Sequence, residues 1–179
     1  MEAFLAPSYA KSQIFFHPEL GQQTLYGARA NLAFSGRKYV GIVFDLGLQF
    51  SVREPFAETD WLIGPRFTLR GKKATGFVHA LRGPSWSEDP VSLLDSLLGE
   101  SVSPKSEFVA FRMSLGAGLD INVSKRFAIR VVQVDYVPTR FSGNWQDGRR
   151  LAAGLVIKFS RASVEGADEP PGAGPAGSQ

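Results

Sequence analysis

The sequence predicts an all-β protein built as an antiparallel up-and-down barrel of eight strands. Hydrophobic residues recur with a period of two through residues 1–160, and no helical repeat interrupts them. The connectors between these segments are short and long in turn, which is typical of a meander with all its tight turns at one end. Closing such strands into a barrel removes the exposed edges of an open sheet.

Two segments show the alternation most clearly. In Val40–Ser51 every second residue from Val40 to Phe50 is hydrophobic, and Val109–Val123 repeats the pattern over a longer run. Strict alternation over such lengths predicts strands with two chemically different faces. The other strands are predicted, in order, at Glu2–Lys11, Tyr26–Phe34, Trp61–Arg70, Phe77–Gly83, Phe127–Phe141 and Leu151–Phe159.

Two of these strands contain an irregularity. Pro65 has no amide hydrogen to donate to a sheet, so we expect a local bulge there. In Phe127–Phe141 the hydrophobic phase slips by one residue between Val131 and Val132, which predicts a second bulge.

The connectors and the composition define the domain organisation. Short connectors are predicted at Gly36–Tyr39, Gly71–Ala74 and Ser124–Arg126, and long ones at Ser12–Thr24, Arg53–Asp60, Pro84–Glu107 and Ser142–Arg149. The composition changes once, because Arg161–Gln179 is rich in proline, glycine and acidic residues, which is typical of a disordered tail. We therefore expect one barrel domain at 1–160 and a tail at 161–179.

Composition excludes several classes of function. The 179 residues, 44% of them hydrophobic, suit a single folded domain. The chain has no cysteine, which excludes disulfides, thiolate metal sites and a cysteine nucleophile. Its two histidines, His17 and His79, are far apart in the sequence, so we expect no metal and no cofactor. The arginines are spread over many strands, which does not indicate a nucleic-acid partner.

The polar face of the strands decides which side points outward. A soluble barrel turns its hydrophobic side inward, whereas a membrane barrel turns it to lipid. Here the polar face is rich in glycine and carries arginines and aspartates, a combination that suits a narrow lumen where empty positions make room for guanidinium groups. The residues predicted to face the lumen are Arg29, Asp45, Arg66, Arg70, Arg82, Arg112, Asp120 and Asp135.

The hydrophobic face is then predicted to contact lipid. It is too bulky to fit inside an eight-stranded barrel, and aromatic residues gather near strand ends, as in the interfacial girdles of membrane barrels. We expect lipid contacts from Val40, Ile42, Phe44, Leu46, Leu48, Phe111, Met113 and Leu115.

The C-terminal part of the chain resembles a known family. LGAGLDINVSKRFAIRVVQVDYVPTRF at Leu115–Phe141, followed by RRLAAGLVIKFS at Arg149–Ser160, resembles the OmpA-like, small porin-family barrels of the bacterial outer membrane. GPRFTLR at Gly64–Arg70 and GFVHAL at Gly76–Leu81 are similar to the family's fourth and fifth strands. The resemblance covers about residues 1–160.

This resemblance implies a transmembrane barrel of the cell envelope, with short periplasmic turns and longer external loops. It implies a non-enzymatic structural or membrane-integrity role, either alone or with a weak pore activity. The partners would be outer-membrane lipid and the barrel assembly machinery. Gly154, Ile157 and Phe159 resemble the family's insertion signal, although Ala152 stands where that signal usually has a polar residue. Met1–Phe4 shows no signal peptide, which we interpret as a mature or truncated form.

Two candidate sites have alternative interpretations. The lumen charges either line an ion path or form a salt-bridged plug, and the plug is favoured because eight strands leave an interior that side chains just fill. In the loop at 84–107, Asp89 and Pro90 predict the start of a short helix and Gly99 its end. That helix would either bind an external partner or pack over the barrel mouth.

Two other functions remain open at this point. One is a soluble, lipocalin-like carrier of a small apolar ligand. The other is a barrel acyltransferase or lipase, which would need His17 beside Glu19 and either Ser12 or Ser85. His79 is expected in a strand, near a rim or a turn.

Overall fold

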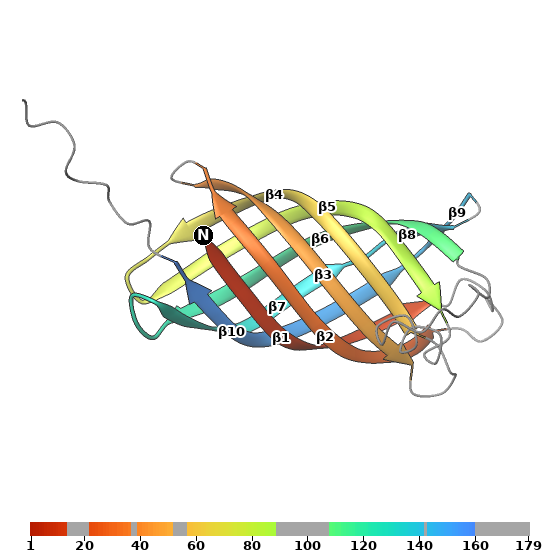
Figure 1. Ribbon diagram of the computed structural model, residues 1–179, viewed down its shortest axis with the longest axis horizontal. Coiled ribbons are helices and arrows are strands. Elements are labelled where there is room, and N and C mark those ends of the chain that lie inside the picture. Colours follow the sequence, from red (N-terminus) through yellow and green to blue (C-terminus); the bar gives the residue numbers. More distant parts are fainter. Residues whose placement is uncertain (14–21, 37–38, 52–56, 89–107, 142, 160–179) are drawn as a thin grey trace, which may run out of the picture.

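The computed structural model describes residues 1–13, 22–36, 39–51, 57–88, 108–141 and 143–159. Within these ranges the chain forms a closed antiparallel barrel of eight long strands in up-and-down order, closed by the pairing of β5 with β6 (Figure 1). The predicted fold class is confirmed. The long strands are β1 (Glu2–Gln13), β2 (Gln22–Ser35), β3 (Val40–Ser51), β4 (Ala57–Arg70), β5 (Ala74–Glu88), β6 (Phe108–Asn122), β7 (Phe127–Tyr136) and β10 (Gly148–Lys158).

Several strands are longer than predicted. β4 begins at Ala57 and β5 continues to Glu88, so the long connectors predicted at Arg53–Asp60 and Pro84–Glu107 are too long. The inward residues of these extensions are polar, such as Asp60 and Ser85, and they find partners inside the barrel. Hydrophobic alternation ends before the strands do because these inward positions carry charge and hydroxyl groups.

The predicted strand Phe127–Phe141 is divided in two. β7 ends at Tyr136, and Thr139–Phe141 forms a separate strand, β8, after Pro138, which has no amide hydrogen to donate. β8 pairs with β9 (Asn144–Gln146) through a turn in which Gly143 has a φ of 88°. The long connector predicted at Ser142–Arg149 is therefore wrong, because a small hairpin occupies it at the end of the barrel opposite the N-terminus (Figure 1).

One predicted bulge is confirmed and the other is wrong. The register of β7 shifts against β6 between Leu119 and Asp120, and against β10 between Ala152 and Gly154. At Pro65, by contrast, the register of β4 and β5 is the same on both sides. The residue before the proline is Gly64, where a Cβ would lie 2.0 Å from the carbonyl oxygen of Ala80. The glycine therefore marks a close approach of two backbones next to Pro65, and not an inserted residue.

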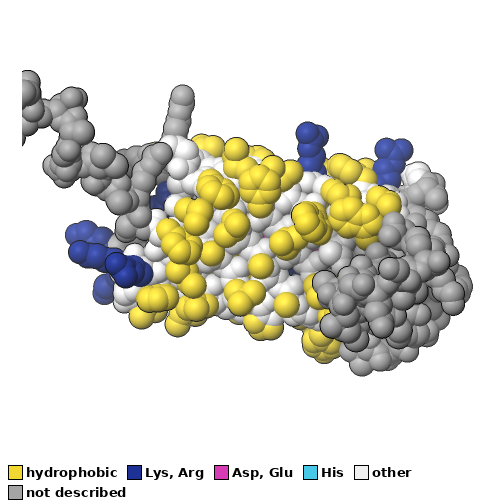
Figure 2. Space-filling model, viewed as in Figure 1, with side chains coloured by type: hydrophobic (Ala, Val, Ile, Leu, Met, Phe, Trp, Pro, Cys, Tyr) yellow, Lys and Arg dark blue, Asp and Glu magenta, His cyan; other side chains and the backbone are white. Residues whose placement is uncertain are grey.

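The hydrophobic face of the barrel points outward (Figure 2). Six of the residues predicted to contact lipid are between 42% and 53% exposed, and Leu48 and Met113 are half-buried on the same face. A continuous exposed wall of this kind is typical of a surface that contacts lipid. The six are Val40, Ile42, Phe44, Leu46, Phe111 and Leu115. Separately, no helix long and apolar enough to cross a membrane is found in the described ranges.

The two ends of the barrel differ. The turns after β2, β4 and β6 lie at the end that also holds Glu2 and Lys158, and we name it the turn end. The opposite end, where β8 and β9 lie, is named the loop end.

Candidate functional site in the barrel lumen

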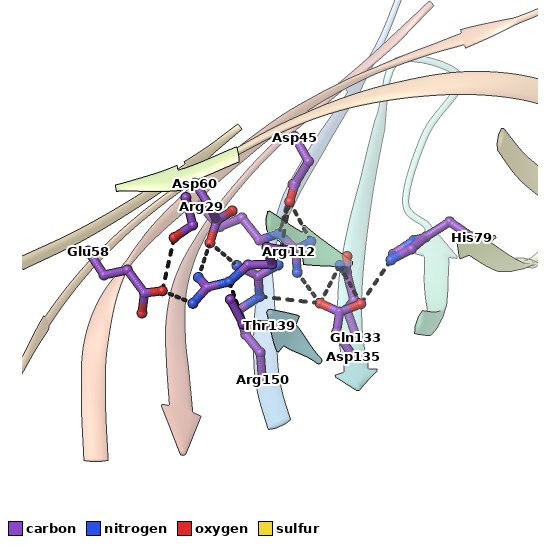
Figure 3. A network of polar contacts seen from close by, with 11 residues as sticks. Arg29, Asp45, Glu58, Asp60, His79, Arg112, Gln133, Asp135, Thr139 and Arg150 are labelled. Atoms are coloured by element: carbon purple, nitrogen blue, oxygen red, sulfur yellow. Dashed lines mark hydrogen bonds and ion pairs between the residues drawn. The ribbon is translucent and has the colours of Figure 1, made fainter. Parts of the chain in front are cut away.

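The inward face of the barrel carries a cluster of charged side chains. Nine charged residues in the described ranges are 2% exposed or less, and seven of them, from β2, β3, β4, β6, β7 and β10, lie together (Figure 3). An isolated charge buried in this way would be strongly destabilising, so each requires a partner of opposite sign. We name this group the lumen network, and its members are Arg29, Asp45, Glu58, Asp60, Arg112, Asp135 and Arg150.

Arg29 forms the centre of one half of the network. Its Nε donates to Asp45 Oδ1 at 2.7 Å, and its Nη2 donates to Asp45 Oδ2 at 2.5 Å. Its Nη1 donates to Asp135 on the other side. One planar guanidinium therefore joins carboxylates from two strands, a geometry that lysine does not offer.

Asp60 forms the centre of the other half. Its Oδ2 accepts from Arg112 Nη1 at 2.9 Å and from Arg150 Nη1 at 2.8 Å. Arg112 also pairs with Glu58, whose carboxylate accepts from Ser85 Oγ at 3.0 Å. The carboxylates of Glu58 and Asp60 thus neutralise two neighbouring guanidinium groups.

Arg150 connects the two halves. Besides its bond to Asp60, its Nη2 lies 3.7 Å from Asp45 Oδ2 and its Nε lies 3.6 Å from Asp135 Oδ2. On the far side of Asp135, His79 Nε2 lies 2.9 Å from Oδ1, and Gln133 Nε2 donates to Oδ2 at 3.1 Å. The result is a continuous set of polar contacts across the barrel (Figure 3).

A second ionic cluster lies nearer the turn end. Arg130 Nε donates to Asp120 Oδ1 at 2.7 Å, and Arg66 Nη1 lies 3.3 Å from Glu2 Oε2. The two guanidinium groups also lie 4.0 and 4.2 Å from the centre of the Phe77 ring. Cation–π contacts of this kind add to the ion pairs in a desolvated interior.

Glycines make room for these side chains. A Cβ on Gly47 would lie 2.7 Å from Asp60 Oδ1, and one on Gly116 would lie 1.9 Å from Asp135 Oδ1. The cavity beside Arg112 and Arg150 measures about 10 Å³, at the lower limit for a single water. Ionic side chains therefore occupy the lumen at this level.

Six of the predicted lumen residues are buried inside the barrel, and two are not. Arg70, the last residue of β4, is 39% exposed at the turn end, where Nη2 donates to Ser35 Oγ at 2.6 Å. Arg82 lies on the outer face. The inward and outward faces of β5 are the reverse of the prediction, because the hydrophobic side chains of Phe77 and Leu81 point into the lumen. The six are Arg29, Asp45, Arg66, Arg112, Asp120 and Asp135.

Several members of the two clusters are absent from the sequence prediction. Glu58 and Asp60 lie on the same inward face of β4 as Arg66, and Arg150 lies on the same inward face of β10 as Ala152. The predicted strands began too late in the sequence to include these three residues. Arg130 lies before the bulge in β7, where the phase changes. His79 was expected near a rim and instead lies in the lumen, stacked on Phe77 at 5.8 Å.

The remaining predicted sites are placed as follows. Ile157 and Phe159 lie on the outward side of the last strand, and a Cβ on Gly154 would lie 2.3 Å from the carbonyl oxygen of Leu5. The insertion signal stays a prediction. His17, Glu19, the expected helix at 89–99 and the tail at 161–179 lie outside the described residues. Within the described ranges, no group of three or more His, Cys, Asp or Glu is placed to hold a metal ion.

Comparison with protein-family models and with curated proteins gave no match. Solved structures, in contrast, are similar along most of the chain. Neisserial surface protein A gives a TM-score of 0.66 at 13% identity, over 88% of this chain and 96% of that one. The N-terminal barrel domain of Pseudomonas aeruginosa OprF gives 0.51 at 11% identity, over 87% and 96%. The outer membrane enzyme PagL gives 0.50 at 14% identity, over 88% and 99%.

These similarities concern the fold, since every identity is low. They agree with the closed up-and-down strand order and with the outward hydrophobic face. The chain therefore has the fold of the small eight-stranded outer-membrane β-barrel proteins.

Proposed function

We propose that the protein is a non-enzymatic barrel of the bacterial outer membrane, with a structural role in membrane integrity and a closed lumen. The lumen network is the observation that carries this proposal. Four carboxylates and three guanidinium groups occupy the space that an ion would have to cross. Each charge is matched by another from a different strand, so the plug also holds the wall together.

Weak pore activity is the less favoured alternative. An ion path needs water-lined space, and the cavity beside Arg112 and Arg150 is about 10 Å³. Opening a path would also separate buried ion pairs, which costs about 3–5 kcal/mol for each charge left without a partner. We therefore expect the wild-type barrel to be electrically silent.

The non-enzymatic part of the proposal rests on where the described candidate groups lie. His79 and Ser85 are both buried in the lumen, where Ser85 donates to Glu58 and His79 contacts Asp135. Both side chains are already engaged with carboxylates inside the barrel, which supports a non-enzymatic role. The proposed partners are outer-membrane lipid and the barrel assembly machinery. Binding of an external partner by the loop at 84–107 stays a prediction, and 84–88 belong to β5.

Conductance in a planar bilayer tests the closed lumen. The refolded full-length protein should give no steady current, whereas a variant with Arg112→Ala and Arg150→Ala, which removes two of the three plugging guanidinium groups, should conduct. Insertion of both is checked by heat-modifiable gel migration. Steady, reproducible channels from the wild-type protein would refute a closed barrel.

Membrane integrity is tested in the bacterium itself. A strain that lacks the gene should take up a hydrophobic dye faster and tolerate less detergent than its parent. The wild-type gene should restore both properties. Unchanged dye uptake and detergent tolerance in the deletion strain would refute the proposed structural role. The conductance result on the closed lumen would not be affected.

A further inference from the structure

Arg82 is a cation in the outward hydrophobic wall. It is exposed on β5, and its direct neighbours on β4 and β6 are Ile63 and Met113. The flanking outward residues along β5 are Ala80 and Pro84. All four are hydrophobic, so none can neutralise a guanidinium group.

The chain offers no described counter-ion for Arg82. No hydrogen bond or ion pair joins it to any residue in the described ranges. Of the carboxylates whose side chains the structure describes, only Asp147 is exposed, and it lies between β9 and β10 at the loop end. A second copy of the chain would therefore present no described carboxylate along its own outer wall. No described residue of this chain or of a second copy supplies a counter-ion on this wall, and a molecule of another kind is the candidate that the described surface offers.

The position of Arg82 along the barrel indicates which part of a lipid it can reach. It lies four residues before Trp86, whose ring is 6.4 Å from that of Trp61 near the loop end. With the rise and tilt of a barrel strand, four residues correspond to about 10 Å along the barrel axis. A long arginine side chain at this depth can extend toward the headgroup region while its stem stays among acyl chains.

A groove on the outer wall begins at Arg82. Its volume is about 980 Å³, and it crosses from β6 to the end of β2 at Gly36. Gly41 and Gly64 have no side chain and Ala80 has only a methyl group, so the larger side chains around them leave a depression in the outer surface. Five neighbouring strands spaced about 4.8 Å apart give a width of about 19 Å. Hydrophobic residues form most of its lining, which suits an acyl chain.

We propose that this groove binds an anionic, phosphate-bearing lipid of the leaflet at the loop end. The lipid phosphate pairs with Arg82, and one acyl chain enters the groove beside Ala80 and Gly64. The inference rests on the membrane location proposed above and goes beyond it, because it assigns a specific lipid site to one part of the wall. Charge complementarity favours a lipid over a second copy of the chain.

Native mass spectrometry tests the site directly. The full chain is inserted into nanodiscs of equal parts phosphatidylcholine and phosphatidylglycerol, and the lipids that remain bound after release are counted. The wild-type protein should retain phosphatidylglycerol about two- to fivefold over phosphatidylcholine, the preference expected from one partly exposed ion pair. Arg82→Leu should lose this preference, and Arg82→Lys should keep most of it.

Two further variants test separately how the groove and the charge of Arg82 contribute to lipid binding. Ala80→Phe fills the groove while keeping the charge of Arg82 and should reduce retention of both lipids. Arg149→Leu removes another exposed cation, on β10 at the loop end, and should leave the preference unchanged. Heat-modifiable migration confirms that each variant is inserted, and Arg82→Leu should insert at least as well as the wild type because it adds a hydrophobic side chain to a lipid-facing wall.

Three results would overturn the proposal. The first is an unchanged lipid preference in Arg82→Leu. The second is loss of the lipid preference in millimolar inorganic phosphate while both lipids stay bound. That result would mean that Arg82 binds a free anion and not a lipid phosphate. The third is a dimer whose mass replaces the bound lipid and which Arg82→Leu abolishes. If the lipid site fails, a barrel that inserts in the nanodisc and is non-conducting in the planar bilayer still supports the proposed function.

Discussion

Arg29 on β2 and Asp135 on β7 form an ion pair across the lumen, although they are 106 positions apart in the sequence and their strands are not neighbours in the sheet. Backbone hydrogen bonds join only adjacent strands. This pair, together with the contacts of Arg150 to Asp45 and Asp60, adds connections through the middle of the barrel. The lumen network therefore connects strands that no backbone hydrogen bond joins.

Asp60→Asn should destabilise the barrel. Asp60 accepts from both Arg112 and Arg150, and the amide removes a buried negative charge that these two guanidinium groups share. We expect a loss of about 3–5 kcal/mol in the free energy of unfolding. Urea titration of the protein in vesicles, followed by tryptophan fluorescence, measures it. Lys72→Gln, in an exposed turn, is the matched control and should change stability by less than about 0.5 kcal/mol. Equal effects of the two substitutions would contradict a stabilising network.

Gly116→Ala and Gly76→Ala should have different effects. A Cβ on Gly116 meets Asp135 Oδ1 at 1.9 Å and His79 Nε2 at 2.6 Å, whereas a Cβ on Gly76 meets nothing within 4 Å. Overpacking at Gly116 should cost about 1–3 kcal/mol of unfolding free energy. Gly76→Ala should be neutral or slightly stabilising, because alanine restricts the unfolded chain. Unfolding midpoints in urea compare the two, and a tolerated Gly116→Ala would mean that the lumen is less tightly filled than we infer.

Phe44→Lys tests whether the outer wall contacts lipid or water. Phe44 is 50% exposed near the middle of β3, and Phe50 is 40% exposed near the loop end. In a membrane, Phe44→Lys should cost about 2–4 kcal/mol and Phe50→Lys about 0–1 kcal/mol. The measurement is unfolding from phosphatidylcholine vesicles. A soluble carrier would show no such dependence on depth and would stay in solution without detergent.

Fluorescence quenching should distinguish the positions of the three tryptophans relative to the membrane. Trp145 lies on β9 and is 53% exposed, whereas Trp61 and Trp86 lie on the barrel wall. A protein with Trp61→Phe and Trp86→Phe keeps only Trp145, whose fluorescence aqueous iodide should quench efficiently. A protein with Trp145→Phe should be quenched mainly by lipids that carry bromine on their acyl chains. The opposite pattern would place the β8–β9 hairpin in the membrane.

The particular errors of the sequence prediction have local causes. The start of β4 was missed because its inward residues, such as Asp60, are polar and do not continue the hydrophobic alternation. Pro138 separates β7 from β8, although the hydrophobic pattern alone predicts one continuous strand. The phase of β5 was reversed because Phe77 and Leu81 are hydrophobic and yet point inward. That reversal placed Arg82 in the lumen by prediction and on the outer wall in the structure.

The sequence by itself determined the class of the fold, the order of the strands and most of the outward face, from Val40–Phe50 through Val109–Val123. Alternation is a property of each strand alone, so it can be read without knowing which strand lies beside which. Only the tertiary structure decided which charges meet. Contacts such as Arg29 with Asp135 depend on the register of every strand between them and on the closure of the barrel. The same closure, and not the composition, separates the charges of the lumen from Arg82 on the outer wall.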